Sequence, residues 1–215
     1  MFNLFNKLKY LMLGIIAFTL SMSAHADNMA PDVLVKTTTQ DVTTILKRDK
    51  AAYANDPQKL YALIDAKVLP HFDFNQMTTL AMGRYWGQAT PAQQQMLIKE
   101  FRTLLVRTYA NALAAFNNQV VEFKSFSMAP EASDVTVQTQ VKQPGAQPIP
   151  INYSMEKTAA GWKVYDVTID GVSLVLNYRG SFGTEIRNKG VDSLIKTLVA
   201  RNQQNPAAAT APSTK

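Results

Sequence analysis

Apolar side chains recur every three or four positions over the first part of the chain, which predicts amphipathic helices. Val35, Val42 and Leu46 lie on one such face, and the Asn55-Asp56-Pro57 triplet supplies a stop. The helices predicted from this spacing cover residues 32–53, 58–69 and 72–82.

A long helix is the strongest local prediction. Thr90-Pro91-Ala92-Gln93 places a hydroxyl at the N-cap, proline at the first helical position and glutamine three residues after the cap. One broad apolar face then continues from Leu97 to Phe116, so the helix spans roughly 27 residues and ~40 Å. A helix of that length can cross a whole sheet.

The period of apolar positions changes from 3.6 to 2 after Val120, which indicates strands. Four apolar runs follow one another, and turn residues such as Gln143-Pro144-Gly145 and Ala159-Ala160-Gly161 separate them. Connections this short predict an antiparallel meander of four strands over 119–170.

Helical spacing returns after Asp170-Gly171 and predicts two further helices over 172–186 and 191–199. Residues 202–215 show no period and are rich in Ala, Pro and Thr, which predicts a disordered tail. The expected fold class is α+β in a single domain over 27–201. It combines a curved four-stranded sheet and a long helix with helical parts over 27–118 and 171–201.

The first 26 residues have the pattern of a secretory signal peptide. Lys7 and Lys9 precede a short apolar run, and Ala24-His25-Ala26 supplies small residues for cleavage after Ala26. A membrane-spanning helix needs about 20 apolar residues, so retention as a membrane anchor is the less favoured reading. The chain contains no cysteine, which excludes disulfides, thiol catalysis and a lipoprotein anchor. A Gram-negative periplasm fits these features best.

Charge and histidine content narrow the chemistry further. The formal net charge is +6, and removal of Lys7 and Lys9 with the leader lowers it to +4. An exported location argues against nucleic acid, so we expect the charge to meet lipid headgroups or acidic protein surfaces. His71 is the one histidine beyond the leader, and neither a G-x-S-x-G nor an HExxH motif occurs. Hydrogen bonding at a turn is therefore favoured over catalysis for His71.

Asp166 and Asp170 lie at the end of the last predicted strand and are the one candidate acid–base pair. A structural role is favoured for both. Asp170 precedes Gly171 and is expected to cap the next helix, whereas Asp166 is expected to bond backbone groups at the rim of the sheet.

Two blocks of sequence carry a distinctive set of motifs. The first block contains Leu69-Pro70-His71-Phe72-Asp73-Phe74, Met82-Gly83-Arg84-Tyr85-Trp86 and Ala89-Thr90-Pro91-Ala92-Gln93. The second contains Gly161-Trp162-Lys163-Val164-Tyr165-Asp166-Val167, Asp170-Gly171-Val172-Ser173-Leu174, Asn177-Tyr178-Arg179 and Lys189-Gly190-Val191-Asp192-Ser193-Leu194. In order and spacing these blocks resemble the MlaC family, also called the toluene-tolerance auxiliary family.

The resemblance implies a monomeric periplasmic phospholipid carrier with a cone-shaped fold like that of nuclear transport factors. Such a carrier encloses the acyl tails of a diacyl phospholipid in an apolar cavity, uses no cofactor and makes or breaks no bond. The implied partners are an inner-membrane ABC transporter with an MCE-domain protein and an outer-membrane complex of a lipoprotein with a porin. The implied role is to maintain the lipid asymmetry of the outer membrane.

For any single aromatic or apolar residue here, core packing is the better explanation, but a curved sheet closed by a helix also makes a cavity. From periodicity, the residues expected to line that cavity are Tyr109, Leu113, Phe116, Val137, Ile151, Tyr153, Val164, Tyr165, Val172, Val175 and Tyr178. The basic residues expected near its mouth or on a partner-facing surface are Arg84, Arg107, Arg179 and Arg187. Ordinary solvated surface is the alternative for these arginines.

Two other functions compete with the carrier. An enzyme on a similar cone would use Asp166, Asp170 and Tyr165 for proton transfer on a small hydrophobic substrate. A periplasmic chaperone would bind unfolded or lipidated protein instead.

Overall fold

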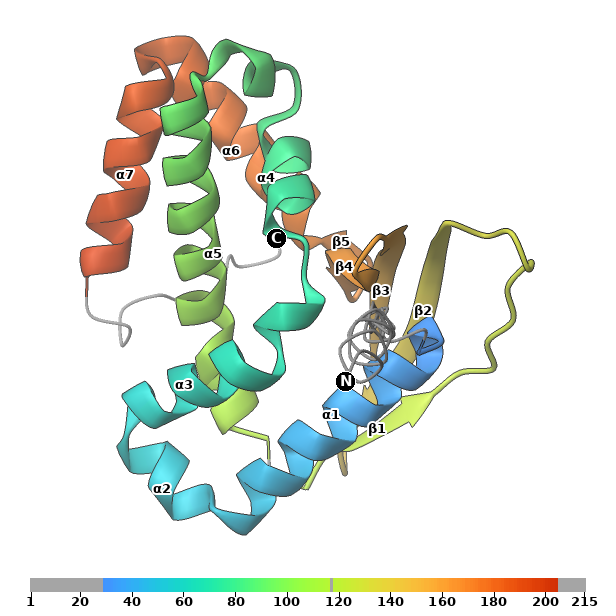
Figure 1. Ribbon diagram of the computed structural model, residues 1–215. Coiled ribbons are helices and arrows are strands. Elements are labelled where there is room, and N and C mark those ends of the chain that lie inside the picture. Colours follow the sequence, from blue (N-terminus) through green and yellow to red (C-terminus); the bar gives the residue numbers. More distant parts are fainter. Residues whose placement is uncertain (1–28, 117, 205–215) are drawn as a thin grey trace, which may run out of the picture.

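In the computed structural model, which describes residues 29–116 and 118–204, a bundle of helices stands beside a five-stranded antiparallel sheet (Figure 1). The helices are α1 (Pro31–Arg48), α2 (Lys50–Asn55), α3 (Pro57–Lys67), α4 (Phe74–Met82), α5 (Pro91–Ala114), α6 (Leu174–Lys189) and α7 (Val191–Gln203). Two 3₁₀ segments are η1 (Leu69–His71) and η2 (Gly83–Gln88). The strands are β1 (Val120–Phe123), β2 (Asp134–Lys142), β3 (Ile149–Thr158), β4 (Gly161–Ile169) and β5 (Val172–Ser173). The predicted α+β class is confirmed, whereas the predicted leader and most of the predicted tail lie outside the described residues.

Side-chain caps fix where the main helices begin. The predicted capping box at α5 is present, because the backbone N–H of Gln93 donates to Thr90 Oγ1 and the N–H of Thr90 donates to Gln93 Oε1. The Asp56 carboxylate accepts from backbone N–H groups at the start of α3, and Asp73 does the same at the start of α4.

The helix predicted over 32–53 is two helices, α1 and α2, with a break at Asp49. Asp49 has φ −110° and ψ 30°, outside the helical region, and its carboxylate is bound by the Arg48 guanidinium at 2.7 Å. Aspartate is a poor helix former because its side chain competes for local polar groups. Apolar periodicity continues through Asp49, which is why the pattern alone misses the break.

The strands follow one another in the order β1-β2-β3-β4-β5, so the predicted meander is confirmed with one strand added. The additional hairpin joins β4 to β5 through Asp170 and Gly171, whose φ values of +50° and +80° suit a two-residue turn with both residues left-handed. Asp170 therefore forms a turn, and the expectation that it caps the next helix is wrong. The N-cap of α6 is Ser173, whose hydroxyl accepts from the backbone N–H of Leu176.

A β-bulge explains why the inward-facing residues of β4 switch from even-numbered to odd-numbered positions. Trp162 and Val164 point to the same face of the sheet as Val167, although strict alternation forbids it. The β3–β4 register shifts between Ser154 and Met155, which leaves Tyr165 as the extra residue on β4. Tyr165 consequently lies on the opposite face from Val164.

Three hydrophobic cores hold together the elements that the structure describes. The helical core joins α4, α5, α6 and α7 around Phe101, whose ring meets those of Tyr178 and Phe182 edge-on at centroid distances of 5.1 and 5.2 Å. The sheet core consists of Val35, Val137, Met155, Trp162, Val164 and Val167. The connecting core consists of Val42, Leu46, Leu60, Leu63, Ile64 and Ala110.

The cores show which helix covers the sheet. Val35 of α1 packs on the sheet core, and α1 then runs on to α2 and α3, where Val42 and Leu46 enter the connecting core (Figure 1). The long helix α5 contributes Leu97 and Phe101 to the helical core instead. A long helix is present as predicted, but α1 is the one whose apolar face meets the sheet.

The last described helix, α7, continues to Gln203, so it includes the first two residues of the segment predicted as a tail. Asn202 is buried, and its amide donates to the backbone carbonyl of Glu100 at 2.9 Å and to the Glu100 carboxylate at 2.8 Å. No helix among residues 29–116 and 118–204 is long and apolar enough to cross a membrane.

The contact between α7 and α5 gives a first prediction. Replacing Asn202 with alanine should lower the free energy of unfolding by about 1–3 kcal/mol, because it leaves the buried side of Glu100 without its amide donor. Urea denaturation measures the loss, and Gln203→Ala, at an exposed neighbouring position, is the control with no expected change. Equal stability of the Asn202→Ala protein and the control would show that this contact does not anchor α7.

Candidate functional site

The candidate catalytic carboxylates are structural. Asp166 Oδ1 accepts from the backbone N–H groups of Val167 and Val175 at 2.8 and 3.1 Å, and Asp166 Oδ2 accepts from Ser173 Oγ at 2.5 Å. The carboxylate therefore ties β4 to the first turn of α6, as the favoured interpretation of Asp166 expected. Asp170 is exposed in the β4–β5 turn.

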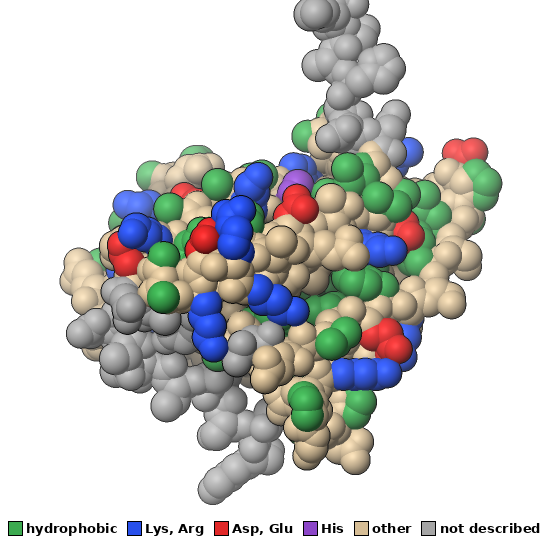
Figure 2. Space-filling view, turned by 90° about the horizontal axis from the view of Figure 1, so that it is seen from below, with side chains coloured by type: hydrophobic (Ala, Val, Ile, Leu, Met, Phe, Trp, Pro, Cys, Tyr) green, Lys and Arg blue, Asp and Glu red, His purple; other side chains and the backbone are tan. Residues whose placement is uncertain are grey.

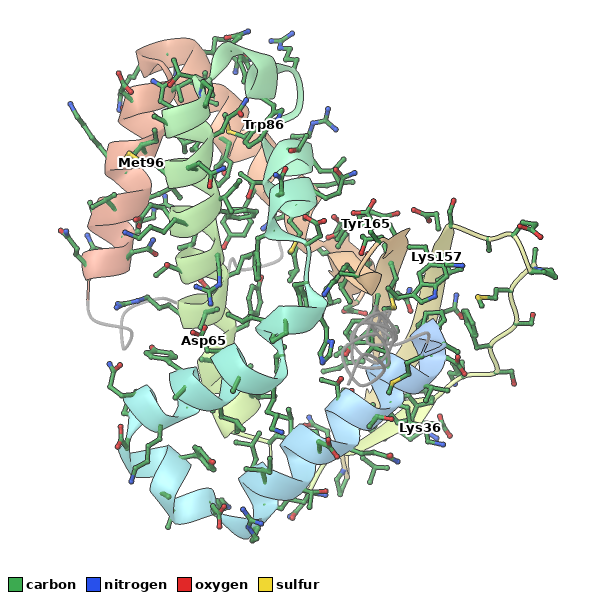
Figure 3. All side chains as sticks on the ribbon, viewed as in Figure 1. Lys36, Asp65, Trp86, Met96, Lys157 and Tyr165 are labelled. Atoms are coloured by element: carbon green, nitrogen blue, oxygen red, sulfur yellow. The ribbon has the colours of Figure 1, made fainter. Side chains whose placement is uncertain are left out.

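Tyr165 does not join these two aspartates. Its hydroxyl donates to Asp134 Oδ2 at 2.8 Å, and Figure 3 shows Tyr165 at the upper edge of the sheet, away from α1. The three residues of the enzyme hypothesis thus have separate surroundings and form no common site.

His71 lies in η1 and is half-buried. Burial and the neighbouring Lys163 ammonium both lower the pKa of His71 below its usual value, which keeps the imidazole neutral at pH 7. Among the described residues there is no group of three or more Asp, Glu or His side chains that could hold a metal ion.

The predicted cavity residues fall into three groups. Four are buried within the cores: Val137, Val164, Val175 and Tyr178. Five are half-buried: Tyr109, Leu113, Ile151 and Tyr153 at the margins of the cores, and Phe116 just beyond the end of α5, where the Lys47 ammonium lies 5.5 Å from the centre of its ring. The remaining two stand apart, because Tyr165 lies on the polar face of the sheet and Val172 is 38% exposed next to the β4–β5 turn.

Four members of the half-buried group come from two elements, α5 and β3, that pack on different cores. Tyr109 and Leu113 occupy the last two turns of α5, where Tyr109 packs on the helical core and Leu113 on the connecting core. Ile151 and Tyr153 occupy the inner face of β3, where they pack on the sheet core. Each of these large side chains has protein on one side and remains accessible on the other, which is the arrangement expected at the wall of an apolar site.

Further half-buried apolar residues extend this group, and none of them is among the cavity residues expected from periodicity. Phe72 packs against both the helical and the sheet core, and its ring stacks on Phe74 with a centroid distance of 5.9 Å. Ile45 of α1 and Leu69 of η1 pack at the edge of the connecting core. Phe72 and Phe74 belong to the first motif block, so the motif signalled them although their spacing did not.

Hydrophobic side chains also reach the outside of the molecule. Viewed from below, many of them gather on the right-hand part of the face, with Lys and Arg side chains among and beside them (Figure 2). A cavity of about 380 Å³ lies between α1, η1 and the β3–β4 hairpin, and its lining includes Leu34, Pro70, His71 and Trp162.

The phenols in this region are held neutral. Burial, together with the nearby Tyr178, raises the pKa of Tyr109 to about 12, and burial also raises the pKa of Tyr153. At neutral pH these tyrosines present apolar rings and uncharged hydroxyls. The half-buried group can therefore bind apolar surface, and it offers no acid or base for proton transfer.

Tyr109 gives a second prediction, which concerns alkaline stability. A tyrosine ionises near pH 10 in the unfolded chain, so a folded pKa raised to about 12 means that the fold favours the neutral phenol. The stabilisation is complete below pH 10 and is lost as the pH rises from 10 towards 12. We expect Tyr109→Phe to lose less stability than the wild type over this range in pH-dependent urea denaturation. Identical losses for both proteins would contradict the assignment.

The structure brings three of the four predicted arginines together. Arg84, Arg179 and Arg187 line one cavity of about 410 Å³ between η2 and α6. Arg107 is elsewhere, on α5, where its guanidinium donates to the carbonyl of Gln204 at 3.4 Å. These arginines lie on three separate segments, η2, α5 and α6, and the sequence held no signal that Arg84 converges with Arg179 and Arg187.

Comparisons with known proteins agree with this architecture. The family model described as MlaC protein matches residues 36–200. The toluene tolerance protein Ttg2D of Pseudomonas putida is 27% identical over 169 residues, which cover 78% of each chain. The intermembrane phospholipid transport system binding protein MlaC of Haemophilus influenzae is 23% identical over 185 residues, covering 85% of this chain and 86% of the relative.

A solved structure extends the likeness to three dimensions. The phospholipid-binding protein from Ralstonia solanacearum, determined in complex with a phospholipid, aligns with a TM-score of 0.75 and 40% sequence identity. The alignment covers 81% of this chain and 97% of that protein. The match of the family model over most of the chain shows that this protein belongs to the MlaC family.

Proposed function

We propose that this protein is a periplasmic phospholipid carrier that encloses acyl chains between its helical bundle and its sheet. The observation that carries the proposal is the group of half-buried apolar side chains on α5, β3 and the segment 69–74, where all three cores meet. The phospholipid-bound relative from Ralstonia solanacearum, at 40% identity, supports the same ligand class.

Physical chemistry explains why such a lipid needs a carrier. Each buried methylene is worth about 0.8 kcal/mol, so two acyl chains of ~14 methylenes represent about 22 kcal/mol of unfavourable exposure to water. A protein that covers both chains with apolar side chains removes that barrier to crossing an aqueous compartment. Because apolar contacts are non-directional, the chains can leave again once a partner opens the site.

The proposed wall consists of Tyr109, Leu113, Phe116, Ile151 and Tyr153, together with Phe72 and Phe74. Val137, Val164, Val175 and Tyr178 support this wall from within the cores. In this proposal the lipid is held without any cofactor, and no bond is made or broken.

The transport route is also part of the proposal. The carrier would exchange lipid with an inner-membrane ABC transporter that bears an MCE-domain protein, and with an outer-membrane complex of a lipoprotein and a porin. Such a cycle would maintain the lipid asymmetry of the outer membrane. The relative from Haemophilus influenzae, which is named as a component of an intermembrane phospholipid transport system, supports this route.

A transfer assay tests carriage directly. Donor liposomes hold a fluorescent phospholipid at a self-quenching concentration, acceptor liposomes hold none, and a dialysis membrane that passes only the protein separates them. The proposal predicts that fluorescence appears in the acceptor compartment in proportion to the protein concentration. No transfer above the protein-free rate, with either anionic or zwitterionic lipid, would refute it.

A further inference from the structure

The cavity between η2 and α6 has an unusual combination of charges. Arg84, Arg179 and Arg187 line it together with Tyr85 and Thr184, and no carboxylate is among its lining residues. All three arginines are exposed, and none of them takes part in an ion pair with any residue in 29–116 or 118–204.

The nearest acidic residues along α6 and α7 are already bound by other groups. Glu185 accepts from Ser193 Oγ at 2.6 Å and pairs with Lys189 at 3.5 Å. Asp192 accepts from the side-chain amide of Gln93 at 2.6 Å. Three guanidinium groups thus share one concavity, and neither Glu185 nor Asp192 neutralises them. Positive charges that converge in this way favour the binding of an anion.

Local contacts hold Arg84 in place, and Arg179 lies close to the backbone of Gly83. The Arg84 guanidinium lies 5.0 Å from the centre of the Tyr85 ring and donates to the Tyr85 hydroxyl at 2.9 Å. Arg179 crosses directly over Gly83, where a Cβ would stand 2.7 Å from its Nε and 2.8 Å from its Nη2. The φ of +53° at Gly83 is what favours glycine there, because the exposed end of Arg179 could move aside for a Cβ.

Small residues keep the cavity open between these side chains. Gly180 and Gly183 of α6 both line it, and a Cβ at Gly183 would already touch the Tyr85 ring at 3.4 Å. The result is a concavity of about 410 Å³ whose lining includes one guanidinium group from η2 and two from α6. A planar guanidinium donates pairs of hydrogen bonds that match the oxygens of a phosphate group.

This cavity is separate from the proposed acyl-chain wall. The chain leaves the sheet at Phe72, which pairs with Val164 of β4, and α4 then leads away from the sheet to Gly83. Figure 3 shows Trp86 of η2 at the upper end of the helical bundle, away from the sheet. A lipid headgroup bound in this cavity would therefore belong to a membrane next to this end of the bundle, and not to the lipid that the protein carries.

We propose that the cavity formed by Arg84, Arg179 and Arg187 binds the phosphate groups of anionic lipid headgroups, and that it orients this end of the helical bundle towards a membrane surface. This contact goes beyond carriage of the enclosed lipid and does not depend on it. The recognised chemistry is a phosphate group, whether free or part of a headgroup, and the following experiment distinguishes these two sources.

The test uses sedimentation of the purified protein with vesicles at low salt. One set of vesicles contains phosphatidylglycerol mixed with phosphatidylcholine, and the other contains phosphatidylcholine alone. The triple variant replaces Arg84, Arg179 and Arg187 with glutamine. Each basic residue near an anionic surface contributes roughly fivefold to binding, so this variant should bind the anionic vesicles about a hundredfold more weakly than the wild type. Arg107→Gln, on α5, is the matched control and should bind as the wild type does.

Two further measurements complete the test. Phospholipid that co-purifies with the triple variant should equal that of the wild type, which separates this proposal from the acyl-chain proposal. Inorganic phosphate should shift the amide resonances of η2 and α6 and compete with the vesicles at millimolar concentrations.

Three outcomes would overturn the proposal. The first is equal vesicle binding by the triple variant and Arg107→Gln. The second is phosphate binding without any preference for anionic vesicles, which would leave a site for the free ion alone. The third is loss of co-purified lipid in the triple variant, which would assign the arginines to the headgroup of the carried lipid.

Discussion

Replacing Leu113 with aspartate is expected to empty the protein of phospholipid at neutral pH. Leu113 is half-buried at the end of α5, beside the connecting core. An ionised carboxylate there would lose its hydration whenever an acyl chain covered it, at a cost of at least ~3 kcal/mol, which corresponds to more than a hundredfold in binding. Lipid extraction and quantification from the purified variant measures the effect, and acidification should partly restore binding by neutralising the carboxyl.

Two companion variants separate loss of the site from loss of the fold. Leu176→Asp places the same charge on α6 at a side chain that is 57% exposed, so it should leave the lipid content unchanged. Leu113→Trp keeps the position apolar but fills space, and it should reduce lipid content without a new charge. A folded Leu113→Asp protein that retains the wild-type amount of lipid would remove Leu113 from the proposed wall.

Asp166→Ala should cause a large loss of stability, because it detaches β4 from the start of α6. The carboxylate accepts three hydrogen bonds, from Val167, Ser173 and Val175, and the last two lie where α6 begins. Its removal leaves partly buried N–H groups without an acceptor, which should lower the free energy of unfolding by about 3–4 kcal/mol. Chemical denaturation followed by circular dichroism measures the change.

Asp166→Asn is the conservative comparison, because an amide oxygen can still accept from a backbone N–H and its NH₂ group can donate to Ser173 Oγ. It should recover more than half of the lost stability. Asp170→Asn, in the exposed turn, should be neutral. If Asp166→Ala unfolds like the wild type, the carboxylate does not tie β4 to α6, and a chemical role for Asp166 would again need consideration.

Local chemistry explains which parts of the fold could be predicted. The Thr90 to Gln93 capping box fixes the start of α5 within the sequence itself, and the alternating strands with short turns specify a meander. The Asp170-Gly171 dipeptide is also a strong turn signal, but the helical spacing of the apolar positions that follow it predicts a helix alone and hides the short strand β5.

Features that depend on tertiary packing could not be read from periodicity. The bulge at Tyr165 moves its ring to the polar face of β4, where it binds Asp134, although its apolar character suggested the interior. Likewise, the spacing of α5 shows that it has an apolar face but does not show which neighbour covers that face. Here α4, α6 and α7 cover it, and α1 takes the place over the sheet.

The same reasoning applies to the candidate sites. Helical or strand spacing identifies apolar residues such as Val175 and Tyr109 equally well, whereas only the packed structure shows that Val175 is buried and Tyr109 half-buried. The convergence of Arg84, Arg179 and Arg187 arises because α4 and η2 pack on α6, a relation between segments far apart in the sequence.

Native mass spectrometry tests the central claim most directly. The protein would be isolated from a periplasmic extract without detergent, weighed intact, and then extracted with solvent for lipid analysis. We predict one mass increment that matches a diacyl phospholipid and disappears on denaturation. An empty protein that also fails to take up phospholipid from liposomes would contradict the account.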